Sequence, residues 1–190
     1  MEDILSKLRD SMKQVLSENR YRHVLGVEEV CYDLALIFGY DTIKASIAGI
    51  LHDCAKHLTA EELIRECKKN NLEITETERM QPLLLHAKLG AIYAKEKYNI
   101  LDEDILKAIR YHNTGRPAMS KLEKILYIAD FIEPNRKNIP VLDKAREAAY
   151  QDLDRALVII TGSILNYLTE KDEIIDNLTK DTYEYYVNLG

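Results

Sequence analysis

The stretch that decides the fold is Ala48–Thr59, "AGILHDCAKHLT". It begins as an apolar run and stops at His52 and Asp53, with Lys56 one helical turn after His52. Two adjacent polar groups at the end of a buried segment are either an accident of a helix terminus or half of a metal site. The partners that the rest of the chain supplies decide between these interpretations.

The composition is that of an ordinary globular protein. Of the 190 residues, 46% are apolar and 31% charged, and the 7 Gly and 4 Pro leave few turn signals, which favours long helices. The net charge of −6 argues against a broad nucleic-acid or anionic-membrane surface. The 3 cysteines form no C-x-x-C pair, and no segment approaches the ~18 apolar residues of a membrane span. We therefore expect a cytoplasmic protein without nucleic-acid or membrane partners.

Apolar residues recur with helical periodicity along most of the chain, and no segment alternates with the period of a strand. Helix caps are expected at Asp41 and Asp102, and capping boxes at Thr59 and Ser120. A break is expected near Asp152. The predicted helical segments are residues 4–15, 24–37, 42–51, 59–70, 82–98, 102–112, 120–133, 142–168 and 183–187. The sequence thus predicts an all-α, single-domain bundle over residues 1–190, with a core of about 8–170 and a C-terminal helical extension, 171–190.

Three further histidines and one aspartate fall on the apolar faces of these helices. Residues three, four and seven apart share a helix face, and on this criterion His23, His86, His112 and Asp130 all point inward with their apolar neighbours. A buried carboxylate without a partner is costly, so Asp130 needs a compensating cation.

Together with His52 and Asp53, these four residues form a set of six potential metal ligands without a thiolate. Imidazole and carboxylate groups suit first-row divalent ions such as iron, manganese, cobalt or zinc. A single inward histidine is more often a hydrogen-bonded core residue, and Asp130 alone could be the partner of an arginine. The coincidence of so many inward placements favours a metal site, with His57 as a bystander.

The order His23, His52-Asp53, His86, His112, Asp130 resembles the HD-domain superfamily of metal-dependent phosphohydrolases. Within it, three segments resemble the bacterial YqeK-type symmetrical hydrolases of diadenosine tetraphosphate: "RYRHVLGVEEV" (20–30), "LHDCAK" (51–56) and "HNTGRPAMSKLEKILYIADFIEPNR" (112–136). The resemblance extends over about residues 8–170. It implies an HD-domain helical bundle that cuts dinucleoside polyphosphates to two ADP.

The resemblance also implies roles for individual residues. His23, His52, Asp53 and Asp130 match the primary metal ligands, with Asp53 bridging a second ion. The expected metal is iron, in a mononuclear or dinuclear site, with manganese or another first-row metal as an alternative. The group implied to complete a second metal site or take part in catalysis comprises His86, His112, Lys56 and Asp53.

A further set is implied to bind the phosphates and the nucleotide. Thr114, Gly115 and Arg116 match a phosphate-side loop, and Asn135 with Arg136 match a second polar corner. Asn113 replaces a residue that is often Thr in the family. The whole expected nucleotide-binding set is His23, Gly26, Asp53, Lys56, His86, His112, Thr114, Gly115, Arg116, Asp130, Asn135 and Arg136.

Two other functions stay open at the level of sequence. The first is another HD nucleotide phosphohydrolase, such as a nucleotidase or a hydrolase of alarmones or cyclic dinucleotides, which would share the metal site. The second is a non-catalytic nucleotide-binding HD module, which would be expected to lose ligands. A homodimer is also open, because the tyrosine-rich end "DTYEYYVNLG" could pack on the same chain or on a partner.

Overall fold

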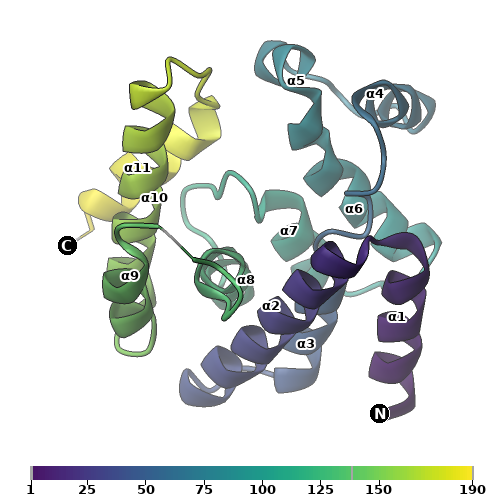
Figure 1. The fold of residues 1–190 in the computed structure, drawn as a ribbon, viewed down its shortest axis with the longest axis horizontal. Coiled ribbons are helices and arrows are strands. Elements are labelled where there is room, and N and C mark those ends of the chain that lie inside the picture. Colours follow the sequence, from purple (N-terminus) through teal and green to yellow (C-terminus); the bar gives the residue numbers. More distant parts are fainter. Residues whose placement is uncertain (1, 138, 190) are drawn as a thin grey trace.

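The computed structural model describes residues 2–137 and 139–189, which fold into helices joined by short loops, with no strand among them (Figure 1). Met1, Asn138 and Gly190, and with them both ends of the predicted domain, lie outside the described residues. In chain order the helices are α1 Glu2–Val15, α2 Glu18–Ile37, α3 Thr42–Leu51, α4 Ala60–Lys69, α5 Glu76–Met80, the 3-10 turn η1 Pro82–Leu84, α6 Leu85–Glu96, α7 Glu103–Tyr111, α8 Lys121–Ile132, α9 Leu142–Ala149, α10 Leu153–Glu170 and α11 Asn177–Val187.

The helices α2 and α3 form the most extensive packed pair of the fold, and α1 covers α3. The pair approaches closely because Gly49 has no side chain: a Cβ there would lie 2.8 Å from the Cα of Glu28. The two helices carry His23 and the His52-Asp53 turn, so this close crossing brings the first polar residues together.

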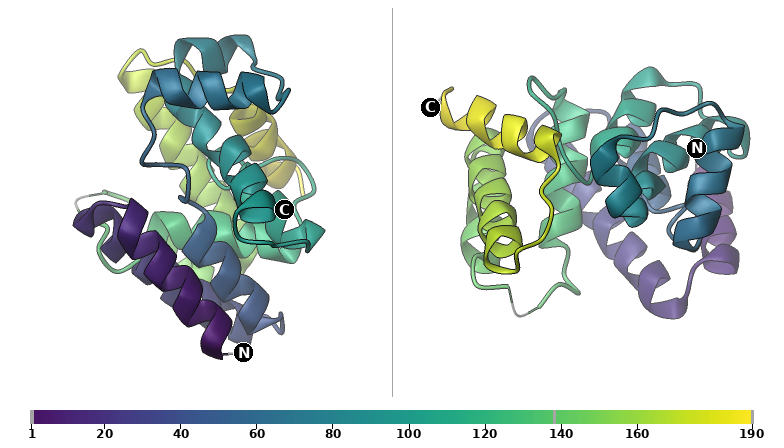
Figure 2. Two further views of the ribbon diagram at one scale, coloured as in Figure 1. Left: turned by 90° about the vertical axis from the view of Figure 1, so that its right-hand side faces the viewer. Right: turned by 90° about the horizontal axis from the view of Figure 1, so that it is seen from above.

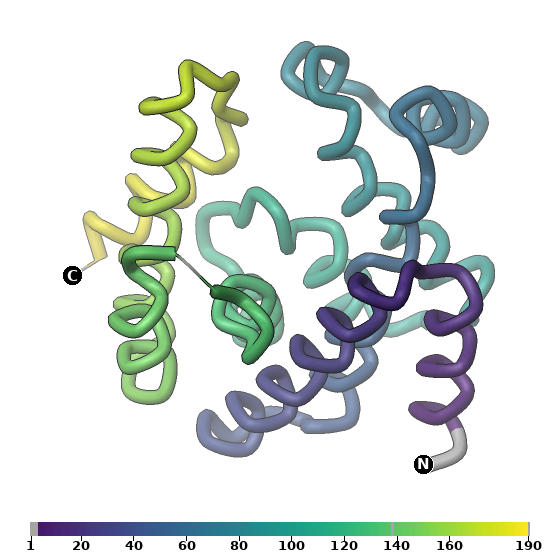
Figure 3. The backbone as a smooth tube through the Cα atoms, in the orientation of Figure 1, coloured from purple at the N-terminus to yellow at the C-terminus, as the bar shows by residue number. Residues whose placement is uncertain are grey.

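The helix α8 runs through the centre of the molecule. It packs against α2, α3 and α7 on one side and against α9 and α10 on the other (Figures 1 and 3). Its apolar residues Leu122, Ile125, Leu126 and Ile128 are all fully buried. A polar residue on this helix therefore needs partners from its neighbours, and Asp130 is such a residue.

The C-terminal helices α10 and α11 pack on each other and form the layer on the far side of α8 (Figure 2). The Met119 N–H donates to the Tyr186 hydroxyl (2.9 Å), and the Thr182 hydroxyl donates to the Thr114 carbonyl (3.2 Å). The C-terminal segment is thereby joined to the loop before α8.

The all-α, single-domain prediction is confirmed, and so are the caps. Asp41 and Asp102 accept from backbone N–H groups at the first turns of α3 and α7, and the capping boxes at Thr59 and Ser120 are both formed. The break near Asp152 is also present, since Asp152 caps α10.

Four details differ from the prediction. Helix α2 begins at Glu18, six residues before the expected segment 24–37, because Ser17 caps it. The helix α5 was not expected, although Thr75 and Glu78 form a capping box for it. Pro82 begins a 3-10 turn, and α6 starts only at Leu85. The last helix begins at Asn177 and not near Tyr183, because Asp176 caps it. None of the described helices has both the length and the apolar content needed to cross a membrane.

Candidate metal centre

Five separate elements bring the six predicted ligands into one cluster. Helix α2 carries His23, α3 ends directly before His52 and Asp53, α6 begins with a turn that holds His86, His112 caps the end of α7, and α8 carries Asp130. His52 is fully buried and Asp53 is 2% exposed. The Asp130 side chain is 23% exposed and lies on the side of the cluster that faces solvent. The stretch Ala48–Thr59 therefore supplies the centre of a polar cluster inside an apolar bundle.

Asp53 lies between two groups of histidines. Its Oδ2 atom is 3.5 Å from Nε2 of His52 and 3.9 Å from Nε2 of His23. Its Oδ1 atom is 3.3 Å from Nε2 of His86 and 3.8 Å from Nε2 of His112. One carboxylate thus faces a pair of imidazoles with each oxygen, which is the arrangement that a bridging ligand requires.

Each of the four histidines has its Nδ1 atom next to an acceptor. The acceptors are the carbonyls of Gly49 for His52 (2.7 Å), Leu83 for His86 (2.6 Å) and Ile109 for His112 (2.7 Å), and the Glu133 carboxylate for His23 (3.1 Å). These acceptors require a hydrogen on Nδ1. Each ring then turns Nε2 toward the cluster, and this outer-shell arrangement is typical of metal-binding histidines.

The geometry fits a metal because two of these Nε2 atoms have no hydrogen-bond partner. The Nε2 atoms of His23 and His52 are buried and make no hydrogen bond, although the Asp130 Oδ1 atom lies 3.0 Å from that of His23. Ligand atoms lie within 4.8 Å of one another in two triads, His23/His52/Asp130 and His52/Asp53/His112. Unpartnered buried nitrogens beside carboxylates are costly unless a cation binds them.

The electrostatics of the cluster favour ligation. Burial, together with the neighbouring His86 and His52, lowers the pKa of His112 to about 3, so its ring stays neutral with an unprotonated Nε2. Burial opposes ionisation of Asp53, but His52 and His86 outweigh it and hold the pKa of Asp53 well below its usual value. The pKa of Asp130 is lowered in the same way, with burial outweighed by His23, His52 and Arg136. A neutral His112 and ionised Asp53 and Asp130 are in the states that bind a metal. Burial opposes protonation of His52, but Asp53 and Asp130 outweigh it and raise the pKa of His52, so a metal bound there would displace a proton.

A cavity of about 310 Å³ opens from the cluster and carries three cationic side chains. Nη1 of Arg20 lies 3.0 Å from Asp53 Oδ2, and Nη2 of Arg136 lies 2.9 Å from Asp130 Oδ1. Nζ of Lys56 is 3.3 Å from both ring nitrogens of His86. Three cations beside a metal-ligand cluster suit a substrate with several phosphate groups.

Some predicted nucleotide contacts lie apart from this cavity. Arg116 makes two hydrogen bonds to Glu123, of 2.7 and 2.6 Å, and does not line the cavity. Thr114 is buried under Thr182, and a Cβ at Gly115, whose φ is +67°, would lie 2.7 Å from Thr182. The phosphate roles of these loop residues stay predictions.

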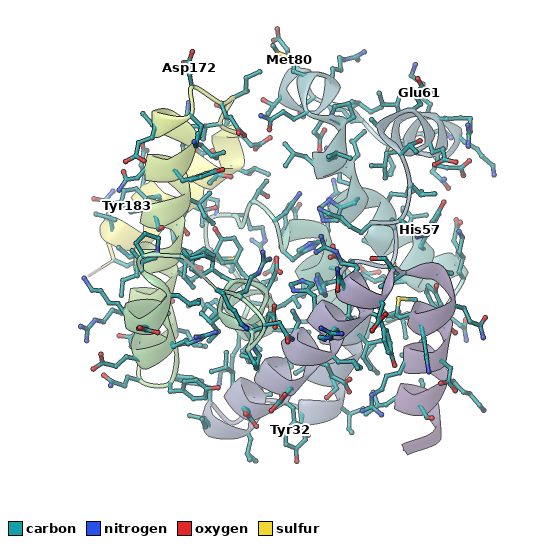
Figure 4. All side chains as sticks on the ribbon, in the orientation of Figure 1. Tyr32, His57, Glu61, Met80, Asp172 and Tyr183 are labelled. Atoms are coloured by element: carbon teal, nitrogen blue, oxygen red, sulfur yellow. The ribbon has the colours of Figure 1, made fainter. Side chains whose placement is uncertain are left out.

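Gly26 and Asn135 lie behind the cluster, where both contact the turn that holds Glu133. A Cβ at Gly26 would lie 2.5 Å from Glu133 Oε2, and that same oxygen accepts from the Asn135 backbone N–H (2.6 Å). Their contact with His23 is therefore indirect, through the Glu133 carboxylate. The predicted bystander His57 is exposed and points to the outer surface (Figure 4).

Two residues of the site, Arg20 and Glu133, were not predicted from the sequence. Arg20 lies three residues before His23, one turn away on the same helix face, and this spacing could have identified it. Glu133 directly precedes Pro134 at the end of α8, and its 2% exposure shows that it is an interior acceptor and not a solvated charge. No periodicity signals Glu133, because it follows the last helical turn.

All six clustered residues fall within residues 20–135, which match the HD domain family. The chain belongs to the HD-domain family. It is 42% identical to a symmetrical bis(5'-nucleosyl)-tetraphosphatase of Halalkalibacterium halodurans over 90% of this chain and 91% of that protein. It is 40% identical to a protein of the same name from Bacillus subtilis, over 93% and 94% of the two chains.

The solved structures include a similar HD-domain protein. A crystal structure of a predicted HD superfamily hydrolase involved in NAD metabolism, from Clostridium acetobutylicum, superimposes with a TM-score of 0.94 and 40% sequence identity. The match covers 97% of each chain. The two proteins therefore share nearly the whole helical bundle.

Proposed function

We propose that this HD-domain hydrolase cuts diadenosine tetraphosphate, and related dinucleoside polyphosphates, symmetrically to give two ADP. The observation that carries the proposal is the buried cluster of four imidazoles around Asp53, open to a cavity with Arg20, Lys56 and Arg136. A polyphosphate needs both features, because its clustered negative charges repel a nucleophile unless cations neutralise them. The names of the similar bacterial proteins support this substrate.

His23, His52, Asp53 and Asp130 would hold the first metal ion, and His86 and His112, sharing Asp53, would hold a second. We propose iron as the native metal, in a mononuclear or dinuclear site, with manganese or another first-row ion able to replace it. When bound, the metal would lower the pKa of a water molecule and neutralise charge on the phosphoryl oxygens.

The cationic residues have separate tasks in this proposal. Arg20 and Arg136 would hold non-bridging phosphate oxygens, since a guanidinium binds such oxygens with two parallel hydrogen bonds. Burial lowers the pKa of Lys56 despite the nearby Asp53, so its ammonium group gives up a proton more readily than a solvated lysine. Lys56, which lies 3.3 Å from His86, would supply positive charge and donate its ammonium proton to the departing ADP.

We also propose that the protein works in the cytoplasm, in keeping with its three buried free cysteines. A homodimer stays a prediction. Size-exclusion chromatography with light scattering of the full chain would decide it, since a mass near twice that of the chain is the expected result for a dimer.

The function is tested by separating the products of metal-loaded protein incubated with diadenosine tetraphosphate. Release of ADP alone is the expected result. Formation of AMP and ATP, or turnover of a mononucleotide, an alarmone or a cyclic dinucleotide in place of diadenosine tetraphosphate, would mean another HD phosphohydrolase. Metal-loaded protein that binds nucleotides but hydrolyses none of these compounds would be a binding module.

A further inference from the structure

A second cavity, which the proposed reaction leaves unused, lies between α10 and the loop that joins α8 to α9. It has a volume of about 550 Å³, within the range of small-molecule sites. Its apolar lining includes Phe131, Ile139, Pro140 and Ile164, and Tyr167 is 56% exposed beside it. We call this cavity the α10 groove.

We infer that the α10 groove binds one of the two nucleosides of the dinucleoside tetraphosphate, with the base against Tyr167. The inference rests on the proposed function, because it takes the substrate from there. It adds a specificity site to the metal cluster and the phosphate contacts.

The α10 groove is continuous with the metal-side cavity. Phe131, Arg136, Ile139 and Ile164 line both cavities, so the α10 groove begins where the cavity at the cluster ends. Arg136 stands at the junction, anchored by hydrogen bonds to the Asp130 carbonyl (3.1 Å) and carboxylate (2.9 Å). A phosphate chain held at Arg136 would leave the cluster directly into the groove.

The symmetry of the substrate also requires nucleoside sites beside the metal cluster. A dinucleoside tetraphosphate carries a nucleoside at each end, so cleavage at the central bridge leaves a nucleoside on both sides of the metal cluster. Each needs an apolar surface for its base, because bases bind proteins chiefly by stacking on aromatic and apolar side chains. The shared lining of the two cavities supplies such a surface on one side.

The groove lining offers both an aromatic surface and hydrogen-bonding groups. Ser163, Tyr167 and Glu170 lie four and three residues apart on one face of α10, and Asn166 lines the groove beside them. The phenol ring offers a stacking surface, while the hydroxyl, amide and carboxylate groups can hydrogen-bond the edge of a base or the ribose hydroxyls. An apolar floor with a few polar groups at its edge is typical of a nucleoside site.

A competing cleft on the other side of Arg136 has a different character. It is lined by Arg20, Arg22, Arg136 and Lys137, and the described residues that line it include no aromatic ring other than the His23 imidazole. Such a surface suits phosphate oxygens and offers a base little to stack on. The charge distribution therefore favours the α10 groove for the nucleoside.

Binding can be tested with a fluorescent reporter, since the chain contains no tryptophan. Tyr167→Trp keeps an aromatic ring in the groove, and titration of the metal-loaded variant with ADP is expected to quench the new emission as the base stacks on the indole. The matched control is Tyr32→Trp. Tyr32 is 45% exposed on α2, away from α10 in Figure 4, and its replacement should report no quenching. Equal responses of the two variants would overturn the inference.

Kinetics provide the second readout. For Tyr167→Ala we expect kcat/KM for diadenosine tetraphosphate to fall about tenfold, the effect of losing one base-stacking contact. Tyr167→Phe should restore it, and Tyr32→Ala should leave it unchanged. Unchanged kcat/KM in Tyr167→Ala overturns the inference while the proposed function stands.

Two further outcomes separate the alternatives. If Tyr167→Ala converts a dimer to a monomer at unchanged kcat/KM, the groove is a subunit interface and the inference is wrong. If the wild type releases no ADP from diadenosine tetraphosphate, the proposed function fails, and the titration of Tyr167→Trp with ADP still decides whether the groove binds a nucleotide.

Discussion

The two ends of α8 both hold buried charges, but only at one end do buried polar atoms lack hydrogen-bond partners. At its start, the Glu123 carboxylate is 1% exposed and accepts from Arg116, through two hydrogen bonds, and from the Ser120 backbone N–H. Near its end, Asp130 belongs to a cluster in which buried imidazole nitrogens have no hydrogen-bond partner. A buried charge with all its partners present is tolerated in a stable fold, whereas buried polar atoms without partners indicate a site for a ligand.

The largest effect on activity is expected from a substitution in the His-Asp cluster near the end of α8. Asp53→Ala removes the carboxylate that faces all four histidines, so hydrolysis should fall by more than about a hundredfold, since the loss of an outer-shell partner alone can reach that size. Steady-state assays and metal analysis of the purified variant would measure this. His57→Ala is the control and should keep nearly full activity. Equal losses in both would mean that the wrong residues of the stretch Ala48–Thr59 were identified as ligands.

A smaller effect is expected from the outer shell of the cluster. Glu133→Ala removes the acceptor at Nδ1 of His23, which orients the ring. Metal affinity should fall by about 10- to 100-fold, measured by competition with a chelator. Glu133→Gln, which keeps an acceptor, should recover part of the loss. Wild-type affinity in Glu133→Ala would show that His23 needs no orientation to bind the metal.

Substitutions of the two arginines near the ends of α8 should have opposite effects on activity and stability. Arg136→Ala should lower kcat/KM by about tenfold through one lost charge-assisted contact with phosphate, with little change in melting temperature. Arg116→Ala leaves the buried Glu123 unpaired, so it should lower the free energy of unfolding by about 3 kcal/mol and change kcat/KM little. Thermal melts and kinetics of both variants would be compared. The reverse pattern would favour the phosphate role predicted for Arg116 from sequence.

Per pH unit, the stability of the metal-free protein should change least. The pKa of His112 is about 3 in the folded protein and near 6.5 when unfolded, so the unfolded state takes up a proton first as the pH falls. This contribution to stability is complete above about pH 6.5 and is lost progressively toward pH 3, by at most about 1.4 kcal/mol per pH unit. His112→Asn should flatten the slope of unfolding free energy against pH in that range. An unchanged slope would show that His112 takes up its proton at the same pH in the folded and unfolded protein.

Local signals in the sequence predicted most of the helices and the inward direction of four candidate ligands, His23, His86, His112 and Asp130. The caps at Asp41, Thr59 and Ser120 are short-range chemistry, so they are readable without tertiary structure. Helix faces likewise follow from spacing alone, which is why His23 and Asp130 could be placed inside the bundle.

The sequence could not predict which carboxylate each buried or half-buried cation would contact. Arg20 and Arg116 are both arginines near predicted ligands, but one reaches Asp53 and the other Glu123, and only the packing of α2 and α8 decides which. Glu133 was missed for the same reason, because its partner His23 is 110 residues away in sequence. The α10 groove joins α8, a loop and α10, and no local pattern marks such a junction.

The most direct test of the metal centre is the metal content of the folded protein after anaerobic purification from cells supplied with iron. The wild type should carry a stoichiometric first-row divalent ion, and Asp53→Ala, folded by circular dichroism, should have lost it. A folded wild type without such an ion, or equal metal content in the two proteins, would contradict the assignment of the His-Asp cluster as a metal site.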